Sequence, residues 1–486
     1  MTPSWLIMAQ QAAHEWGPLL ASLLHLALAL AVCIHALLNK RDVHRALGWI
    51  ALAWLVPVAG PLLYLMLGIN RIHRAGVALG LKASWQGEQA SVYDSATPDA
   101  PCRPELAGIS RLTRLVTGKP LLAGNAATPL VNAEQAYPAM LKALEDACRS
   151  VTLLTYIFND DEAGQAFAAA LLRAQARGVQ IRVLIDAVGA RYSRVNMVKQ
   201  LAGQGIRAAA FLPPKLQHLL AQANLRNHRK IMVVDGEFGF TGGMNIGAGH
   251  WFSSRPALPI QCLHFSVRGP VVTELQRAFA IDWAFTTGEI LRGPTWFADN
   301  KPCGPVLARG VPDGPDADND HMRQVMLGAL AAAQRRVRIV TPYFLPDEVV
   351  LTTLQMMALR GVAVDIVLPK RSNLPLMDWA MQPQLRSLVE SGCRVYLSGP
   401  PFDHTKLFVM DEAWSLIGST NWDARSLRLN FEYNLECHDA HLVQALDVLV
   451  EQRIAGLQPL SGEWLARQSL GVQLRNRMIS LLAPYL

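Results

Sequence analysis

A short segment in the middle of the chain carries side chains suited to phosphate chemistry on an apolar background. The segment NHRKIMVVDGEFGFTGGMN covers residues 227–245 and places His228 and Lys230 two residues apart. Residues i and i+2 of a strand face the same way, so the imidazole and the ammonium group are expected to project together. Asp235 and the glycine after it lie between two apolar runs and predict a hairpin turn, which would bring Asn245 back toward the histidine.

The same arrangement returns in the second half of the chain. DHTKLFVMDEAWSLIGSTN covers residues 403–421, with His404 and Lys406 two apart and Asp411 at the expected turn. Ser419 and Asn421 follow at the positions that hold a glycine and an asparagine in the first copy. A single His-x-Lys is usually a solvated strand edge. A duplicated one with matching Asp, small-residue and Asn positions is much harder to obtain by chance.

In one shared pocket the two copies would supply two imidazoles, two ammonium groups, two amides and a hydroxyl. Lysines as point charges and asparagines as directional donors suit a phosphate group. One histidine could attack phosphorus and form a covalent intermediate while the other protonates the leaving oxygen. The lysine pair replaces the charge of a metal ion, so we expect neither a metal nor a cofactor. Asp235 and Asp411 complete the candidate catalytic set, although their position at a turn also suits a local structural role.

The surroundings of the two motifs repeat as well. VTLLTYIFNDDE at residues 151–162 resembles VRIVTPYFLPDE at residues 337–348, and each is followed by a helix ending in Arg-Gly-Val and then by an apolar strand. Strands alternating with helices predict two similar α/β repeats, which we place at residues 116–300 and 301–486. A pseudo-two-fold axis between the repeats would give them one shared site.

Two apolar runs precede the repeats, at residues 17–38 and 49–67, and each is long enough to cross a membrane. We expect a membrane-anchoring segment over residues 1–80 and a linker over 81–115. Pro57 and Pro61 should break or kink the second run. The basic clusters after each run, which include Arg41 and Arg71, leave two topologies open: two full spans, or a second run that enters the membrane and returns.

Composition limits the class of protein. The 486 residues suit two or three domains, and 51% hydrophobic with only 17% charged residues favours membrane association of part of the chain. The net charge of +7 fits an anionic partner, either nucleic acid or acidic lipid. Seven scattered cysteines without a C-x-x-C motif predict free thiols rather than disulfides or a zinc site. Residues 463–486 predict a helix that either lies on an anionic membrane or packs on the catalytic core.

The duplicated motif resembles the signature of the phospholipase D superfamily, His-x-Lys-x4-Asp followed by Gly-Gly/Ser-x-Asn. RNHRKIMVVDG, TPYFLPDE, GSTNWDARSLRLNFEYN, the twin apolar runs and the ending LLAPYL make the likeness closest to bacterial cardiolipin synthases, over essentially the whole chain. The resemblance implies two phospholipase D-like repeats preceded by two N-terminal membrane helices. It also implies phosphatidyl transfer between two phosphatidylglycerol molecules through a phosphohistidine, giving cardiolipin and glycerol. Metal and nucleic acid would play no part. The expected location is the bacterial inner membrane, with a multi-pass anchor and a cytoplasmic catalytic domain.

The resemblance also implies roles for the site residues. His228 would be the nucleophile and His404 the general acid and base, with the opposite assignment left open. The phosphate-binding and assisting residues would be Lys230, Lys406, Asn245, Asn421 and Ser419. In this family a carboxylate from a later strand usually backs each histidine.

Glu432 fits the role of that carboxylate in the second copy, whereas Cys262 stands at the matching position of the first. The thiol is expected to orient His228 weakly, unless His264 nearby substitutes or the histidines exchange roles. Cys262→Asp is therefore expected to keep or raise activity.

Two other functional classes are considered: a hydrolase that uses the same residues, and a non-catalytic scaffold in which these residues have no chemical role. A hydrolase would release phosphatidic acid or cleave nucleic acid, and the membrane segments disfavour the nuclease. Exclusion of water decides between transfer and hydrolysis, which residue spacing does not reveal. A non-catalytic scaffold is disfavoured because both His-x-Lys pairs are intact. The spacing leaves the oligomeric state and any second alcohol substrate open.

Overall fold

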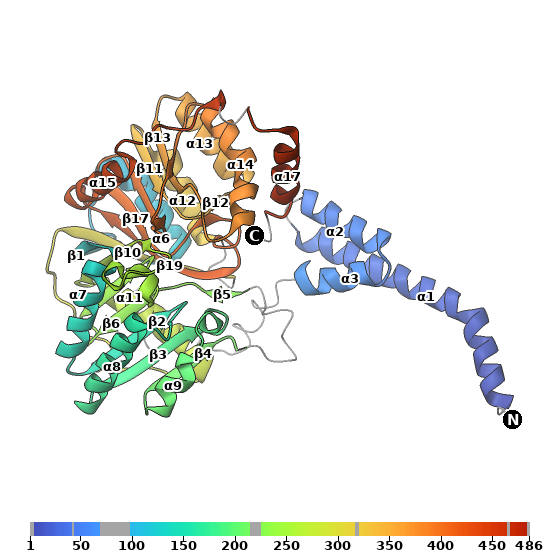
Figure 1. Cartoon of the computed structure of the whole chain (residues 1–486), viewed down its shortest axis with the longest axis horizontal. Coiled ribbons are helices and arrows are strands. Elements are labelled where there is room, and N and C mark those ends of the chain that lie inside the picture. The colour runs from blue at the N-terminus through green and yellow to red at the C-terminus, as the bar shows by residue number, and fades with distance from the viewer. Residues whose placement is uncertain are drawn as a thin grey trace. The chain divides into compact units, whose positions relative to one another are not determined.

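The computed structural model describes residues 4–40, 43–68, 98–213, 225–315, 320–463 and 467–483. The chain divides into two compact units, one made of Met1–Ala75 with Pro214–Asn224 and the other of Gly76–Pro213 with Leu225–Leu486. Figure 1 shows the helices of the first unit and the mixed helices and strands of the second.

Within the described residues the first unit has one helix long enough to cross a membrane. This is α1 (Ser4–Asn39), whose apolar part is Trp16–Asn39. The second apolar run is divided at its prolines, as expected. It forms α2 (Val43–Leu55), α3 (Ala59–Leu63) and a π-helical turn, η1 (Tyr64–Gly68). The run is therefore not a second continuous membrane helix.

The two limbs of the second run fold against each other. A Cβ on Gly60 would lie 2.2 Å from a carbonyl oxygen of α2, so only glycine permits this approach. The Tyr64 hydroxyl bonds Nδ1 of His35 in α1 at 2.7 Å, and the Lys40 ammonium donates to the Gly68 carbonyl. The run thus begins and ends beside the same end of α1. Arg41 and Arg71, from the two basic clusters, lie outside the described residues.

Part of the expected linker belongs to the second unit. Residues 81–97 lie outside the described residues, but η2 (Pro104–Leu106) and α6 (Ala107–Thr117) are ordered elements. Leu106 and Ile109 are buried in the hydrophobic core of the second repeat, so the segment is structured from residue 104 onward.

The first repeat contains, in chain order, β1 (Leu122–Val131), α7 (Asn132–Asp146), β2 (Ser150–Thr155), α8 (Glu162–Ala176), β3 (Gln180–Asp186), η3 (Gly189–Arg191), α9 (Met197–Gly203), β4 (Arg207–Phe211), β5 (Arg226–Asn227), β6 (Ile231–Val234), β7 (Phe238–Gly242), η5 (Ala248–His250), η6 (Phe252–Ser254), β8 (Ile260–Gln261), β9 (Leu263–Arg268) and α11 (Val272–Thr287). The second contains β10 (Val306–Asp313), α12 (His321–Ala332), β11 (Arg336–Val340), β12 (Phe344–Leu345), α13 (Glu348–Leu359), β13 (Ala363–Pro369), α14 (Pro375–Glu390), β14 (Arg394–Ser398), β15 (Phe402–Asp403), β16 (Leu407–Met410), β17 (Trp414–Gly418), β18 (Trp422–Asp423), β19 (Asn430–His438), α15 (Ala440–Ile454) and α17 (Leu470–Ser480).

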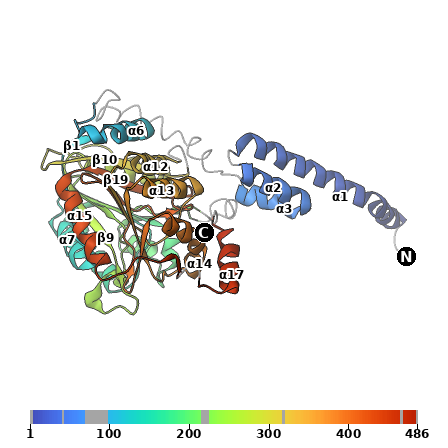
Figure 2. The same ribbon diagram turned by 90° about the horizontal axis from the view of Figure 1, so that it is seen from above.

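The two repeats join edge to edge through one sheet. Its strand order is β14-β13-β11-β16-β17-β19-β10-β1-β9-β7-β6-β2-β3-β4, with β5 paired to β19. Read outward from the antiparallel β10–β1 pair, corresponding strands follow in the same order on both sides. Helices cover the sheet in two views (Figures 1 and 2). Each repeat has its own cluster of buried apolar residues. The prediction of two similar α/β repeats is confirmed.

Candidate active site

Both histidines lie where the repeats meet. His228 follows β5, which pairs with β19 of the second repeat, and its N–H donates to the Phe431 carbonyl at 2.9 Å. His404 follows β15, which pairs with β8 of the first repeat, and its N–H donates to the Gln261 carbonyl at 2.8 Å. Their ring centroids are 6.4 Å apart, and each residue is 8% exposed. The expectation that the two motifs share one site is confirmed.

The two lysines are anchored in matching ways. The Nζ atoms of Lys230 and Lys406 donate at 2.7 Å to the carbonyls of His228 and His404, respectively. Burial lowers the pKa of Lys230 to about 7, with a further contribution from Lys406. Burial likewise lowers the pKa of Lys406 to about 8. An anion bound between them would restore their charged forms, which is the electrostatic requirement of a phosphate site.

His228 has a carboxylate behind it. Its Nδ1 lies 3.1 Å from the Glu432 carboxylate and 3.2 Å from the Ser419 carbonyl. The Ser419 hydroxyl donates to Glu432 at 2.5 Å, and the Asn430 amide donates to it at 3.1 Å. Burial favours the neutral acid, but His228 and Lys230 hold the pKa of Glu432 below its usual value.

The surroundings of His228 favour its neutral form. Burial lowers its pKa to about 4 despite the opposing effect of Glu432, and both lysines add to the shift. An Nδ1–H donated to Glu432 leaves the Nε2 lone pair free. Glu432 would also stabilise the positive charge that forms when Nε2 becomes bonded to phosphorus.

His404 is held by a neutral acceptor instead. Its Nδ1 lies 2.9 Å from the Gly243 carbonyl. The Cys262 thiol donates to the His404 carbonyl at 3.3 Å, and burial raises the pKa of that thiol to about 12. A Cβ on Gly243 would lie 2.8 Å from Cys262 Sγ, so glycine is needed for this packing. Burial, with Lys406 beside the ring, lowers the pKa of His404 well below its usual value.

The expected pairing of histidines with their backing residues is therefore wrong. The sequence suggests Glu432 for the histidine of its own repeat and Cys262 for His228, but the structure crosses them. Each histidine loop pairs with a short strand of the opposite repeat, which carries the ring to that repeat's backing residue. His264 does not substitute for a carboxylate at His228, whose Nδ1 contacts are Glu432 and the Ser419 carbonyl.

The predicted amide and hydroxyl donors differ in their contacts. Asn245 is buried, and its amide oxygen Oδ1 accepts a hydrogen bond from the Ile157 N–H at 3.3 Å, which fixes the orientation of the amide. Asn421 donates to the Ser426 hydroxyl at 3.1 Å. Ser419 bonds Glu432, so its contacts support a role in holding that carboxylate rather than in binding phosphate.

The two motif aspartates lie at the turns. Asp235 accepts from the N–H groups of residues 148–150 at 2.6–2.9 Å. Asp411 accepts from those of residues 334–336 at 2.8–3.1 Å. Both have positive φ, 54° and 49°. A whole strand, at about 3.3 Å per residue, separates each aspartate from its lysine. Their contacts tie each hairpin to the neighbouring strand and support the local structural role.

Sequence reasoning missed the residues that hold the two histidine loops. Asp282 of α11 binds Arg229 at 2.8 Å and the Asn227 amide at 2.8 Å. Arg453 of α15 binds Asp403 at 2.8 Å and the Thr405 hydroxyl at 3.2 Å. Each helix thus binds the residues before and after a histidine. The helix side chain that does so is a carboxylate in the first repeat and a guanidinium in the second. Only the structure brings these distant helix positions to the motifs.

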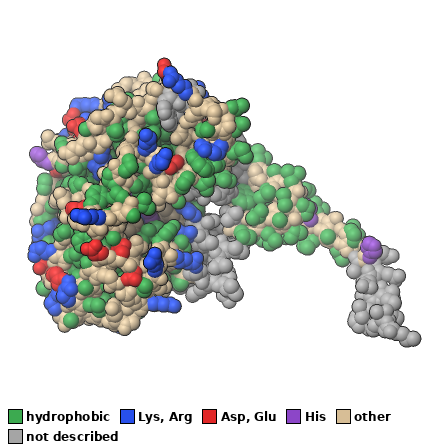
Figure 3. All heavy atoms as spheres, in the orientation of Figure 1, with side chains coloured by type: hydrophobic (Ala, Val, Ile, Leu, Met, Phe, Trp, Pro, Cys, Tyr) green, Lys and Arg blue, Asp and Glu red, His purple; other side chains and the backbone are tan. Residues whose placement is uncertain are grey.

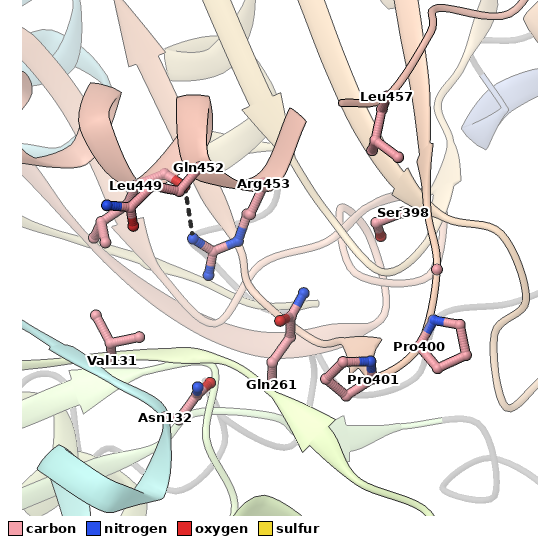
Figure 4. A pocket seen from close by; sticks show the side chains of 11 residues that line it. Val131, Asn132, Gln261, Ser398, Pro400, Pro401, Leu449, Gln452, Arg453 and Leu457 are labelled. Atoms are coloured by element: carbon pink, nitrogen blue, oxygen red, sulfur yellow. Dashed lines mark hydrogen bonds between the residues drawn. The ribbon is translucent and has the colours of Figure 1, made fainter. Parts of the chain in front are cut away.

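Arg453 also lines a cavity of about 340 Å³ between the repeats. Figure 4 shows its guanidinium and the Gln261 amide pointing toward one another from α15 and β8. Gln261 donates to the same Asp403 carboxylate at 3.0 Å. These contacts brace the backbone of His404 from the side of the cavity.

Two further side chains that the sequence did not point to flank the rings of His228 and His404. Tyr156 lies edge-on to His228 at 5.3 Å between ring centroids, and His250 lies 6.1 Å from His404. Among the described residues, no group of three or more His, Cys, Asp or Glu side chains is placed to hold a metal ion. All seven cysteines are free in the structure.

Comparison with known proteins agrees with this geometry. Residues 140–283 and 326–454 match the family described as cardiolipin synthase, PLD-like domain, and residues 27–68 match the phospholipase D-nuclease N-terminal family. The cardiolipin synthase A of Pseudomonas putida is 31% identical, covering 96% of this chain and 97% of that protein. The cardiolipin synthase of Geobacillus kaustophilus is 30% identical, covering 97% and 95%.

A solved structure supports the fold. The phosphatidylserine synthase of Haemophilus influenzae superposes with a TM-score of 0.61 at 15% identity, over 78% of this chain and 100% of that one. At this identity the likeness concerns the fold alone. The matches in sequence span both repeats and the N-terminal apolar segment, and they show that the chain belongs to the cardiolipin synthase family with phospholipase D-like domains.

Proposed function

We propose that this protein joins two phosphatidylglycerol molecules into cardiolipin and releases glycerol, through a phosphohistidine on His228. Family membership makes the chain a phosphatidyltransferase of cardiolipin synthesis. The observation that carries the mechanism is the facing pair of buried imidazoles, 6.4 Å apart, of which His228 alone has a carboxylate at Nδ1. The substrate phosphate would lie between the two Nε2 atoms.

In the first half-reaction His228 Nε2 attacks phosphorus. The bond from phosphorus to the glycerol oxygen breaks, and His404 gives that oxygen a proton, so glycerol leaves as a neutral alcohol. Lys230 and Lys406 neutralise the phosphate oxygens. The bound phosphate offsets the field of the lysines, and so raises the low pKa of His404 toward a value at which it carries the proton.

The second half-reaction runs the same steps in reverse with a new alcohol. His404, now neutral, takes the proton from a hydroxyl of the second phosphatidylglycerol. That oxygen attacks phosphorus, the phosphorus–nitrogen bond breaks and His228 is released. Water in place of this hydroxyl would give phosphatidic acid, so burial of both histidines favours transfer.

We also infer that the two repeats are related by a pseudo-two-fold axis through the site. The matching strand order on either side of the β10–β1 pair supports this, as do the reciprocal β5–β19 and β15–β8 pairs.

The hairpin formed by α2 and α3 supports a second run that enters the membrane and returns, because Gly68 ends beside Lys40. Both basic clusters and the catalytic unit would then lie on the cytoplasmic side of the bacterial inner membrane. Cysteines placed at Arg41 and Arg71 should react with a membrane-impermeant reagent from the same side. Labelling from opposite sides would instead indicate two full spans.

The overall reaction is tested with full-length protein in vesicles that contain labelled phosphatidylglycerol. Cardiolipin and free glycerol in equal amounts are expected, and His228→Asn should form neither. Phosphatidic acid as the only lipid product would replace the transferase with a hydrolase.

A further inference from the structure

We propose that the second compact unit, which holds the two histidines and is called the catalytic unit below, docks on an anionic bilayer in addition to its N-terminal anchor. The docking surface consists of the loop segments at residues 191–196 and 370–376 and of helix α17. This inference rests on the proposed lipid substrate. It concerns how the site meets the membrane, and it is carried by two exposed loops that continue outward from the two histidines and by α17, which packs beside one of them.

The first segment begins at His228. The Tyr156 ring lies 5.3 Å from the His228 ring and 6.2 Å from that of Tyr192. Tyr192 is 67% exposed and lies in a loop after β3 that leads outward from the site. The exposed basic and apolar residues of this loop are Arg191, Tyr192, Arg194 and Val195.

The second segment begins at His404 and takes a matching course. The Phe402 ring lies 6.0 Å from His404 and 6.4 Å from Tyr343, whose hydroxyl bonds Asn373. Asn373 lies in the loop after β13, at the start of α14. The exposed basic and apolar residues of this loop and of the start of α14 are Lys370, Arg371, Leu374, Pro375 and Leu376. Neither segment, 191–196 or 370–376, contains an Asp or Glu.

Helix α17 extends this surface. It packs on α14, where the Arg475 guanidinium lies 4.2 Å from the centre of the Trp379 ring. The opposite face carries exposed apolar side chains at helical spacing, Leu470, Leu474 and Met478, and the exposed Leu481 follows directly after the helix. The helix contains two arginines and no acidic residue. Figure 3 shows hydrophobic side chains beside Lys and Arg side chains over α17. The two sequence-based alternatives for this tail are therefore compatible, because one face packs on the core while the other stays free.

An anionic bilayer fits this surface better than a second copy of the chain. A two-fold dimer through the same face would bring the basic loops of both copies together, which like charge disfavours. Anionic headgroups would instead meet those loops, while the apolar side chains enter the boundary of the acyl chains. A lipid phosphate bound between the two loops would then be close to the histidines. It would reach them by moving inward past Tyr156 and Tyr343.

The test uses the full-length protein in nanodiscs and compares two forms of one substrate. The first is phosphatidylglycerol in the same bilayer, and the second is a short-chain phosphatidylglycerol dissolved as monomers. Leu474→Glu with Met478→Glu, and separately Lys370→Glu with Arg371→Glu, should each lower the rate on bilayer substrate about tenfold. Their rates on dissolved substrate should stay within about twofold of wild type, because the histidine pair is untouched.

Val448→Glu is the matched control. Val448 lies on α15 and is 47% exposed, against 53% for Leu474, and two views place α15 and α17 on opposite sides of the catalytic unit (Figures 1 and 2). It should leave both rates unchanged. Equal losses on both substrates in the docking variants, or no loss on either, would overturn the proposal. Product identity separates this result from the proposed function, since the ratio of rates is informative whether cardiolipin or phosphatidic acid forms.

A direct measurement supports the rates. Backbone amides of α17 in the wild-type protein should exchange hydrogen more slowly in nanodiscs with anionic lipid than in neutral ones. Equal exchange in the two would contradict docking.

Discussion

The two histidine sites share a backbone scaffold but differ in the groups that touch the rings. In both, a two-residue strand pairs with the opposite repeat, and a lysine bonds the histidine carbonyl at 2.7 Å. Behind His228 stands the carboxylate of Glu432, whereas His404 bonds the carbonyl of Gly243. The scaffold therefore fixes where the imidazoles lie, and the backing groups make them chemically unequal.

Under the proposed mechanism, this difference would let one repeated fold give its two histidines different roles. A nucleophile gains positive charge when it bonds phosphorus, and a buried carboxylate stabilises that charge. A proton donor and acceptor must instead change its protonation state twice in each cycle, which a neutral partner permits. The supporting helices also differ between the repeats, because a carboxylate, Asp282, binds the loop of His228 and a guanidinium, Arg453, binds the loop of His404.

The largest effect on kcat is expected from replacing the residues that lie behind the two histidines, Glu432 and Cys262. Glu432→Gln should lower kcat by about 10²- to 10⁴-fold, because a neutral amide does not stabilise the phosphohistidine. Cys262→Ser should change it by less than about threefold, since the thiol bonds a backbone carbonyl. Cys262→Asp should keep activity, acting through His404 rather than His228. Steady-state rates in vesicles measure all three, and similar losses for Glu432→Gln and Cys262→Ser would remove the asymmetry.

A smaller effect is expected at the two helix grips. Asp282→Asn and Arg453→Gln should each lower kcat about tenfold with little change in KM, because they misplace a histidine without removing a phosphate ligand. Asp282→Glu and Arg453→Lys should recover part of the loss. Circular dichroism of each variant would exclude misfolding. A rise in KM at constant kcat would assign these residues to substrate binding instead.

The lysines should make the reaction sensitive to high pH. Their charged forms bind phosphate, and their pKa values of about 7 and about 8 in the free enzyme place the loss of charge just above neutrality. The value of kcat/KM should therefore fall as pH rises through this range, by up to about tenfold per unit for each lysine. In kcat the fall should come at higher pH, since bound phosphate raises the lysine pKa values. A flat kcat/KM to pH 9.5 would contradict these roles.

The smallest catalytic effect is expected at the motif aspartates. Asp235→Ala and Asp411→Ala each leave three backbone N–H groups without their acceptor and should lower stability by about 1–3 kcal/mol. Activity per folded molecule should stay near wild type. Thermal unfolding of the solubilised protein tests the first expectation, and vesicle rates test the second. Loss of turnover without loss of stability would return the aspartates to the chemistry.

Local pattern was sufficient to predict the parts of this site that depend on one segment. His228 and Lys230 do lie close together as predicted, although they fall between β5 and β6 rather than on a strand, and Asp235 turns the hairpin as its Asp-Gly pair predicts. The similar repeats predicted a shared site because duplicated motifs pack against each other.

Contacts between the repeats were beyond the sequence pattern. Glu432 backs the histidine of the other repeat because β5 crosses to β19, a pairing of only two residues. The grip of Asp282 on Arg229 depends on where α11 packs, and no motif marks it. The second apolar run gives another example of a contact that local pattern does not predict. Its prolines predicted the break in the helix, but not that the end of the run returns to Lys40.

The central claim is that His228 carries the phosphatidyl group and His404 carries the proton. A phosphatidyl ester of p-nitrophenol tests it directly, because that leaving group departs without a proton. With this substrate His404→Asn should release p-nitrophenol in a burst and trap the phosphatidyl group on His228, visible by mass spectrometry of the digested protein. His228→Asn should give no burst and no adduct. A phosphatidyl group found on His404, or a burst from His228→Asn, would contradict the account.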